Sequence, residues 1–81
     1  MWRSKVILSK DESLELESSR TKGFMGETEI DNYSVVRPDG TKNGTVTVSE
    51  HIAINGLKRT IHVLQQDVNG KTIVDGRFNP M

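Results

Sequence analysis

The sequence predicts an all-β fold, a small antiparallel β-meander of five or six strands that forms a curled sheet or a partly open barrel. Two Asn-Gly pairs, Asn55-Gly56 and Asn69-Gly70, each lie between runs of alternating apolar residues. Both residue types tolerate the positive φ of a two-residue type I′ turn, so such pairs are strong hairpin signals. The stretch from Thr45 to Phe78 therefore predicts two hairpins that share one strand.

The composition also favours a thin sheet. The 81 residues are expected to form one domain over 1–81, near the lower size limit for a useful hydrophobic core. There is no cysteine, so neither disulfides nor a thiolate metal site can add stability. Aromatic residues make up 5 % of the chain, so Val, Ile and Leu must fill the core. A second copy of the chain is one way to complete such a core.

The N-terminal third contains two expected strands. Arg3–Ser9 predicts a first strand around three consecutive apolar residues. Ser9 and Glu12 match a helix capping box, which raises a helix over 10–20 as an alternative. Leu14 and Leu16 are two positions apart, however, and this spacing fits a strand face rather than a helical stripe. We therefore expect a short second strand through these leucines.

Two loops are expected in the next part of the chain. Residues 18–29 are mostly Ser, Thr, Gly and charged residues, which predicts a flexible surface loop. Phe24 and Met25 at its centre either anchor the loop to the core or bind a partner. A strand over 30–37 follows, and then a hairpin loop over 37–44, because Pro38-Asp39-Gly40 and Asn43-Gly44 are turn sequences.

The central stretch carries a competing helical pattern. Its apolar residues recur every three or four positions, at Ile54, Leu57, Ile61, Leu64 and Val68. The alternative fold is therefore α+β, with one helix around Leu57–Val68. Against it, residues 60–63 favour strands, and a strand-like run directly follows Asn69-Gly70.

The first hairpin turn predicts which side chains form the core face. A two-residue loop at 55–56 pairs Ile54 with Leu57 and Ile52 with Arg59. It then pairs Glu50 with Ile61 and Val48 with Val63. Six of these eight residues are apolar. Glu50 and Arg59 are the exceptions, and we expect a salt bridge between them, either at the rim of the core or beside a ligand pocket.

The opposite face of these hairpins is polar. The second turn places Arg77 opposite His62 and Asp75 opposite Leu64, with His51 diagonal to His62. A solvent-exposed polar face is normal for an antiparallel sheet, but this face carries several positively charged side chains. The candidate anion- or nucleic-acid-binding residues are His51, Lys58, His62, Lys71 and Arg77. No aromatic residue joins them and the net charge is zero, so any nucleic-acid binding is expected to be weak.

Several function classes are not expected. The chain has no phosphate-binding loop, nucleophile elbow or cysteine nucleophile, so we expect neither an enzyme nor a cofactor. Lys and Arg surround the two histidines, so we expect no metal site. No apolar run approaches the roughly 18 residues of a membrane span. The apolar triplet near the N-terminus is too short for a signal peptide, which predicts a cytoplasmic protein.

Protein–protein association is the function that the sequence favours. A meander leaves two sheet edges open for pairing with another strand. Trp2, Phe24 and Met25 have no obvious place in the sheet and are candidate partner-binding residues. We therefore predict a small binding or regulatory module that binds a protein partner or forms a homodimer. The alternative is a weak nucleic-acid- or anion-binding β domain.

Overall fold

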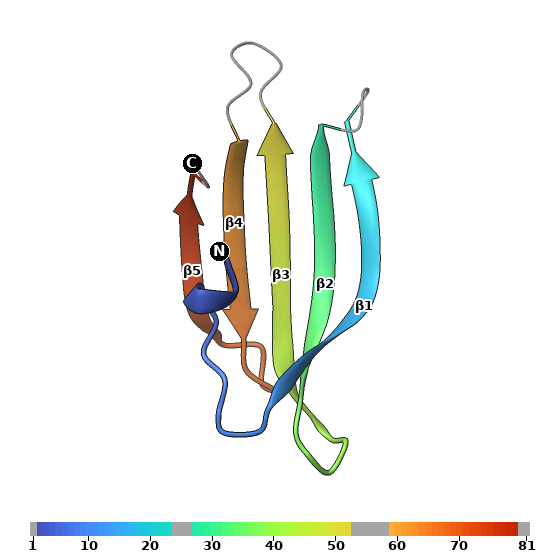
Figure 1. Ribbon diagram of the computed structural model, residues 1–81, viewed down its shortest axis with the longest axis vertical. Helices are drawn as coiled ribbons and strands as arrows, with labels where there is room; N and C mark the ends of the chain where they lie inside the picture. The colour runs from blue at the N-terminus through green and yellow to red at the C-terminus, as the bar shows by residue number, and fades with distance from the viewer. Residues whose placement is uncertain (1, 24–26, 53–58, 80–81) are drawn as a thin grey trace.

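The computed structural model describes residues 2–23, 27–52 and 59–79. A short 3₁₀ helix, η1 (Trp2–Lys5), precedes five strands: β1 (Ser13–Lys22), β2 (Thr28–Val36), β3 (Lys42–Ile52), β4 (Arg59–Gln66) and β5 (Thr72–Phe78). The strands form one antiparallel sheet in chain order (Figure 1). The predicted meander is thus confirmed, and the sheet remains open because β1 and β5 do not pair with each other.

The predicted pairing of the central strands is confirmed. Val48 pairs with Val63, Glu50 with Ile61, and Ile52 with Arg59. Ile54, Leu57 and the turn between them lie outside the described residues. The alternative helix around Leu57–Val68 is wrong for residues 59–66, which form β4. Its β-branched residues favour an extended backbone, and pairing with β3 and β5 on both sides reinforces that preference.

Two turns of the same design connect β2 to β3 and β4 to β5. In the first, the N–H of Gly40 donates to the carbonyl of Arg37, and the N–H of Arg37 donates to the carbonyl of Thr41. Gly70, Asp67 and Lys71 make the same two bonds in the second turn. Gly40 has φ of 89° and Gly70 of 81°, a region that glycine enters without steric cost. Each turn is therefore a type I turn closed by a glycine bulge.

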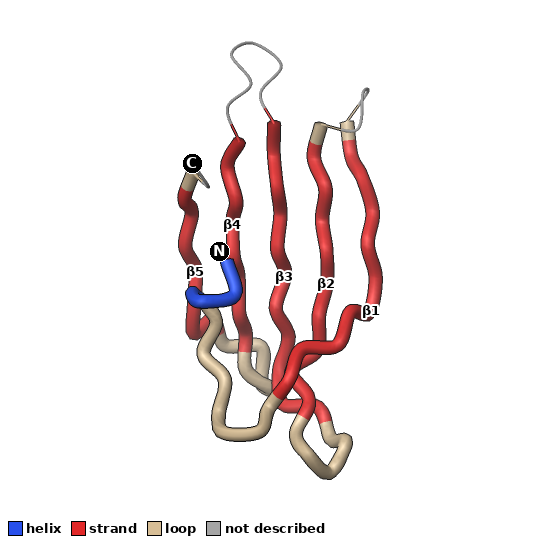
Figure 2. The backbone as a smooth tube through the Cα atoms, viewed as in Figure 1, coloured by secondary structure: helices blue, strands red, loops and turns tan. Residues whose placement is uncertain are grey.

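The N-terminal segment corrects the prediction of a strand over Arg3–Ser9. Residues 2–5 form η1, and residues 6–12 cross the sheet without strand structure (Figure 2). The backbone N–H and C=O of Ile7 bond to the side chain of Gln65, each at 2.8 Å, instead of to a neighbouring strand. No helix among the described residues has the length and apolar character to cross a membrane.

Both predicted loops are shorter than expected. Within 18–29, β1 continues to Lys22 and β2 begins at Thr28. Hydrogen bonds between polar side chains on β1 and β2, such as the one that Asn32 Nδ2 donates to Ser18 Oγ, stabilise this pairing. Within 37–44, β3 already begins at Lys42. Gly44 lies within β3, and its backbone passes so close to β4 that a Cβ there would collide with the Gln66 carbonyl oxygen.

The core lies on one face of the sheet, under the N-terminal segment. Its fully buried apolar residues are Val35, Val46, Val48, Ile61 and Val63. Trp2 and Val6 of the N-terminal segment pack against them, together with Leu14, Tyr33, Val74 and Phe78. Five buried aliphatic side chains at about 1.5–3 kcal/mol each make a small core, and the N-terminal segment adds Trp2 and Val6 to its packing.

Candidate functional site

The predicted polar face exists on the side of the sheet opposite the core. Ser49 pairs with His62 and His51 with Thr60, as the first hairpin requires. His62 also pairs with Arg77, and Leu64 pairs with Asp75, as the second hairpin requires. We call this surface the polar face. It brings His51, His62 and Arg77 onto one side of three neighbouring strands.

Both histidines on the polar face have partners. His62 Nε2 lies 2.6 Å from Asp75 Oδ1, and Asp75 is two residues from the position on β5 that pairs directly with His62. His51 Nδ1 lies 2.8 Å from Thr28 Oγ1 on β2. The two rings therefore bond to different strands rather than converging on one point. Among the described residues, no group of His, Cys, Asp or Glu is arranged to hold a metal ion.

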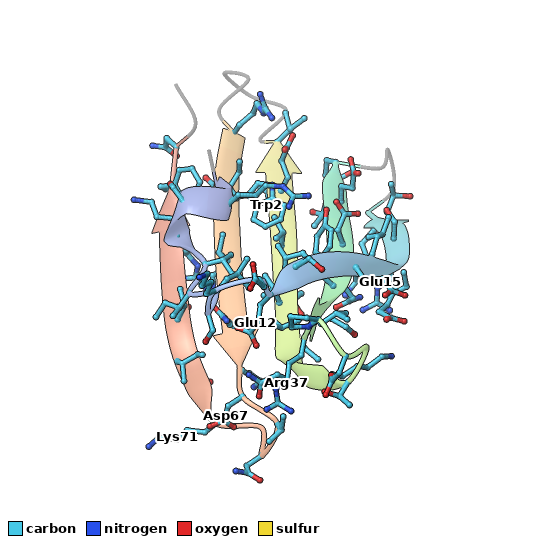
Figure 3. The ribbon with its side chains drawn as sticks, turned by 60° about the horizontal axis from the view of Figure 1, so that its bottom comes forward. Trp2, Glu12, Glu15, Arg37, Asp67 and Lys71 are labelled. Atoms are coloured by element: carbon cyan, nitrogen blue, oxygen red, sulfur yellow. The ribbon has the colours of Figure 1, made fainter. Side chains whose placement is uncertain are left out.

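The remaining predicted cations do not all gather there. Lys71 lies in the β4–β5 turn, beside Asp67 at the end of the sheet distant from His51 (Figure 3). The turn therefore places Lys71 away from the row of side chains at His62, and its part in an anion-binding site stays a prediction. Lys58 lies outside the described residues. Arg77 has no acidic partner within the described part of the chain, since Asp75 is engaged by His62.

Two cations on β1 were missed by sequence reasoning. One row of paired residues crosses the whole sheet as Arg20–Ile30–Ser49–His62–Arg77. The next row runs Lys22–Thr28–His51–Thr60. A residue shift at Leu16/Ser18 decides the face of Arg20 and Lys22, and the expected loop over 18–29 hid this strand. Four strand spacings separate Arg20 from Arg77, about 19 Å, so the row suits an extended anion and not a single phosphate.

The predicted Glu50–Arg59 salt bridge is present on the core face. Arg59 Nη2 lies 2.9 Å from Glu50 Oε2, and Arg59 Nε donates to Glu50 Oε1 at 3.1 Å. This bidentate contact with Glu50 raises the pKa of the Arg59 guanidinium. Both side chains remain partly exposed, so the pair is the rim contact and not a buried pair beside a pocket.

The predicted partner anchors have different outcomes. Trp2 is half-buried and packs on Tyr33, with ring centroids 5.2 Å apart. Trp2 thus packs against the core, and its role as a partner anchor stays a prediction. Phe24 and Met25 lie outside the described residues.

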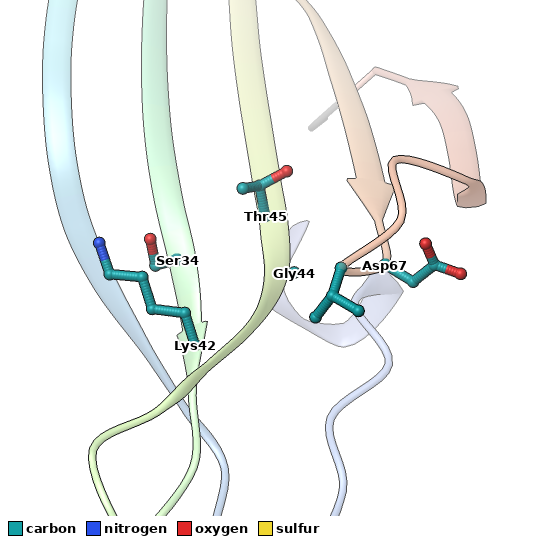
Figure 4. Close-up of a pocket in the computed structure, with 6 residues that line it drawn as sticks. Ser34, Lys42, Gly44, Thr45 and Asp67 are labelled. Carbon is teal, nitrogen blue, oxygen red and sulfur yellow. The ribbon is translucent and has the colours of Figure 1, made fainter.

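A shallow cavity lies at the end of the polar face near the two turns. Its volume is about 250 Å³, and its lining comes from β2, β3 and the β4–β5 turn (Figure 4). Lys42 on its wall bonds to Glu17 at 3.1 Å. This contact lowers the pKa of Glu17 and occupies the cavity's cation.

The sheet edges are the remaining candidate surfaces. Within residues 2–23, 27–52 and 59–79, no strand pairs with the outer side of β1 or of β5. β1 carries a bulge between Leu16 and Ser18, in the middle of the strand. The irregularity in β5 lies near its start, opposite Gln65/Gln66, so Val74–Phe78 is a regular edge. Ile73 on β5 and Leu16 on β1 are exposed to 44 % and 55 %.

Comparison with protein-family models, with curated proteins and with solved structures gives no match for this chain.

Proposed function

We propose that this chain is a non-enzymatic binding module that acts by protein–protein association through a free edge of its sheet, with a second copy as its partner. The observation that carries this proposal is the open meander, in which the described residues leave the outer sides of β1 and β5 unpaired. The backbone N–H and C=O groups of such an edge can accept a strand from another chain. The absence of cysteine supports a cytoplasmic location for this module.

β5 is the better of the two edges for this purpose. The bulge in the middle of β1 interrupts its outer hydrogen-bonding groups, and bulges of this kind protect edges against pairing. β1 also bends across the sheet at its beginning, whereas β5 follows β4 (Figure 1). β5 offers a regular stretch over Val74–Phe78 and an exposed Ile73 beside it.

Sedimentation equilibrium tests the proposal. We expect a reversible monomer–dimer equilibrium that favours the dimer at high micromolar concentration, since strand addition buries a small interface. Ile73→Lys should weaken the dimer, because a lysine on an edge opposes strand pairing. Leu16→Lys is the matched control on the other edge and should leave the dimer intact. A wild-type chain that stays monomeric at high micromolar concentration would reject self-association.

A second candidate function is binding of an extended anion such as single-stranded nucleic acid. The specific support is the row that joins Arg20 on β1 to Arg77 on β5 across the polar face. Lys22 lies in the neighbouring row. No aromatic residue among the described ones pairs into these rows, so stacking would add nothing to the affinity.

Salt dependence and a double substitution test this second function. Binding of a labelled oligonucleotide should weaken steeply with added salt, because phosphate contacts release counterions. Arg20→Ala/Lys22→Ala should weaken it further. Lys10→Ala/Lys71→Ala removes the same charge away from the rows and serves as the control. Equal effects of the two double variants would reject the polar face as the binding surface.

A further inference from the structure

The charges of β5 suit an antiparallel copy of the same strand. On the polar face, β5 carries Asp75 and Arg77 two positions apart, so the edge has both signs of charge. On the core face it carries Val74, Gly76 and Phe78, paired with Gln65, Val63 and Ile61. Arg77 has no acidic partner among the described residues, whereas its neighbour Asp75 bonds to His62 through Oδ1 and is 61 % exposed, so its second oxygen, Oδ2, can accept from another donor. A partner strand that places an acidic side chain opposite Arg77 would therefore give Arg77 an ion pair.

We propose that two copies join β5 to β5 in the antiparallel register that places Gly76 on the two-fold axis. This inference rests on the proposed function and names its partner and register. An antiparallel pair of identical strands is isologous, so every contact away from the axis occurs twice. With Gly76 opposite its own copy, Asp75 faces Arg77 of the second copy, and Val74 faces Phe78. The charged contacts lie on the polar face and the apolar ones on the core face.

Neighbouring registers are worse for electrostatic reasons. An axis at Asp75 places two carboxylates opposite each other, and an axis at Arg77 does the same with two guanidinium groups. Like charges directly opposite destabilise a strand pair. An axis at Val74 leaves Asp75 facing Ile73 and brings Lys71 toward Arg77. An axis at Ile73 falls on the irregular part of β5 and uses the turn residue Lys71. Gly76 is thus the axis position that pairs opposite charges within the regular strand.

The space around Gly76 allows a direct test. A Cβ added to Gly76 meets nothing within 4 Å, so a cysteine fits without disturbing the monomer. Directly opposed residues of antiparallel strands have Cα atoms about 4.5–5.5 Å apart, within the range that a disulfide spans. The wild-type chain contains no cysteine, so any cross-link must come from the new residue.

Oxidation of Gly76→Cys at high micromolar concentration should give a disulfide-linked dimer as the main product. Ile73→Cys reports the rival register with its axis at Ile73, and Glu15→Cys reports pairing through β1. Both should cross-link at least about tenfold more slowly, because their sulfurs lie far from their own copies in the proposed register. Equal or faster cross-linking of either control would overturn the proposed register.

Charge exchange provides a second, independent measurement. Arg77→Asp should raise the dimer dissociation constant about tenfold or more, since it creates two repulsive pairs with Asp75. Asp75→Arg/Arg77→Asp should restore it to within about threefold of the wild-type value, because the opposite charges meet again. The double variant also keeps an acid beside His62, directly across from position 77. Dimers that form in the wild type but show no such rescue would overturn the register and leave the proposed self-association standing.

Discussion

Gln65 connects the N-terminal segment to the sheet through both atoms of its amide. Gln65 Oε1 accepts from the N–H of Ile7, and Gln65 Nε2 donates to the Ile7 carbonyl. The side chain is only 2 % exposed, and no buried side-chain polar atom in the described residues lacks a partner. Because Trp2 and Val6 cover the core from the same segment, this bidentate contact also keeps the core covered.

We expect Gln65→Leu to destabilise the fold by about 1–3 kcal/mol, because it removes two hydrogen bonds worth about 0.5–1.5 kcal/mol each. Trp2 is the only tryptophan, so its fluorescence reports directly on the N-terminal segment. Its emission should shift to longer wavelength as the segment leaves the core. Gln66→Leu, at the neighbouring position with no side-chain bond to this segment, should show neither effect.

Gly44 is the residue at which backbone geometry is most demanding. It has φ of 111°, and a Cβ there would meet the Gln66 carbonyl oxygen. Gly44→Ala should therefore cost about 2 kcal/mol or more in the free energy of unfolding, measured by urea denaturation. Gly40→Ala shares the positive φ but has open space and should cost about 1 kcal/mol. Equal losses in the two variants would show that the close approach to β4 contributes nothing.

At the scale of elements, Glu12 joins the N-terminal segment to β3. Its carboxylate accepts from Asn43 Nδ2 at 2.8 Å and from the N–H of Ser9 at 2.6 Å. The bond from Asn43, followed by that from Ser9, lowers the pKa of Glu12 below its ordinary 4.5. Lys42 lowers the pKa of Glu17 in the same way, and Thr41 that of Asp39.

These carboxylates make stability depend on pH in one direction. Each folded-state pKa is lower than the unfolded one, so the unfolded chain binds more protons in acid. The stabilisation is complete above about pH 4.5 and is lost as the pH falls through the lowered pKa values. Thermal unfolding midpoints should therefore fall on acidification below pH 4.5, and fall less steeply in Glu12→Gln. Glu15→Gln, which removes an exposed carboxylate with no bond in the described residues, should follow the wild type.

The sequence predicted the strands and pairings that short hairpin turns determine. It did not predict the segments whose structure depends on contacts between residues far apart in the chain. Alternation around the two Asn-Gly pairs was enough to pair Val48 with Val63 and His62 with Arg77. The second pairing was correct although the turn spans Asp67–Lys71, because a bulge opposite Gln65/Gln66 restores the register. The N-terminal segment could not be predicted, since its path depends on Gln65, 58 residues further along the chain.

At the scale of the whole molecule, the sheet separates three surfaces with different chemistry. The core face is covered by the N-terminal segment and contains the few buried aliphatic residues. The polar face carries the cation rows that sequence reasoning found in part, because Arg20 and Lys22 joined it only through the bulge in β1. The edge of β5 combines backbone hydrogen-bonding groups with Asp75 and Arg77, and this combination underlies the proposed dimer.

Amide hydrogen exchange measured as a function of protein concentration tests the β5 edge most directly. The outward-facing amides of Val74–Phe78 are unpaired in the monomer and should exchange rapidly in dilute solution. On concentration to the high micromolar range, their exchange should slow as the second copy bonds to them, while the outward amides of β1 stay unchanged. Exchange at β5 that is independent of concentration, or protection that develops along β1 instead, would contradict association through β5.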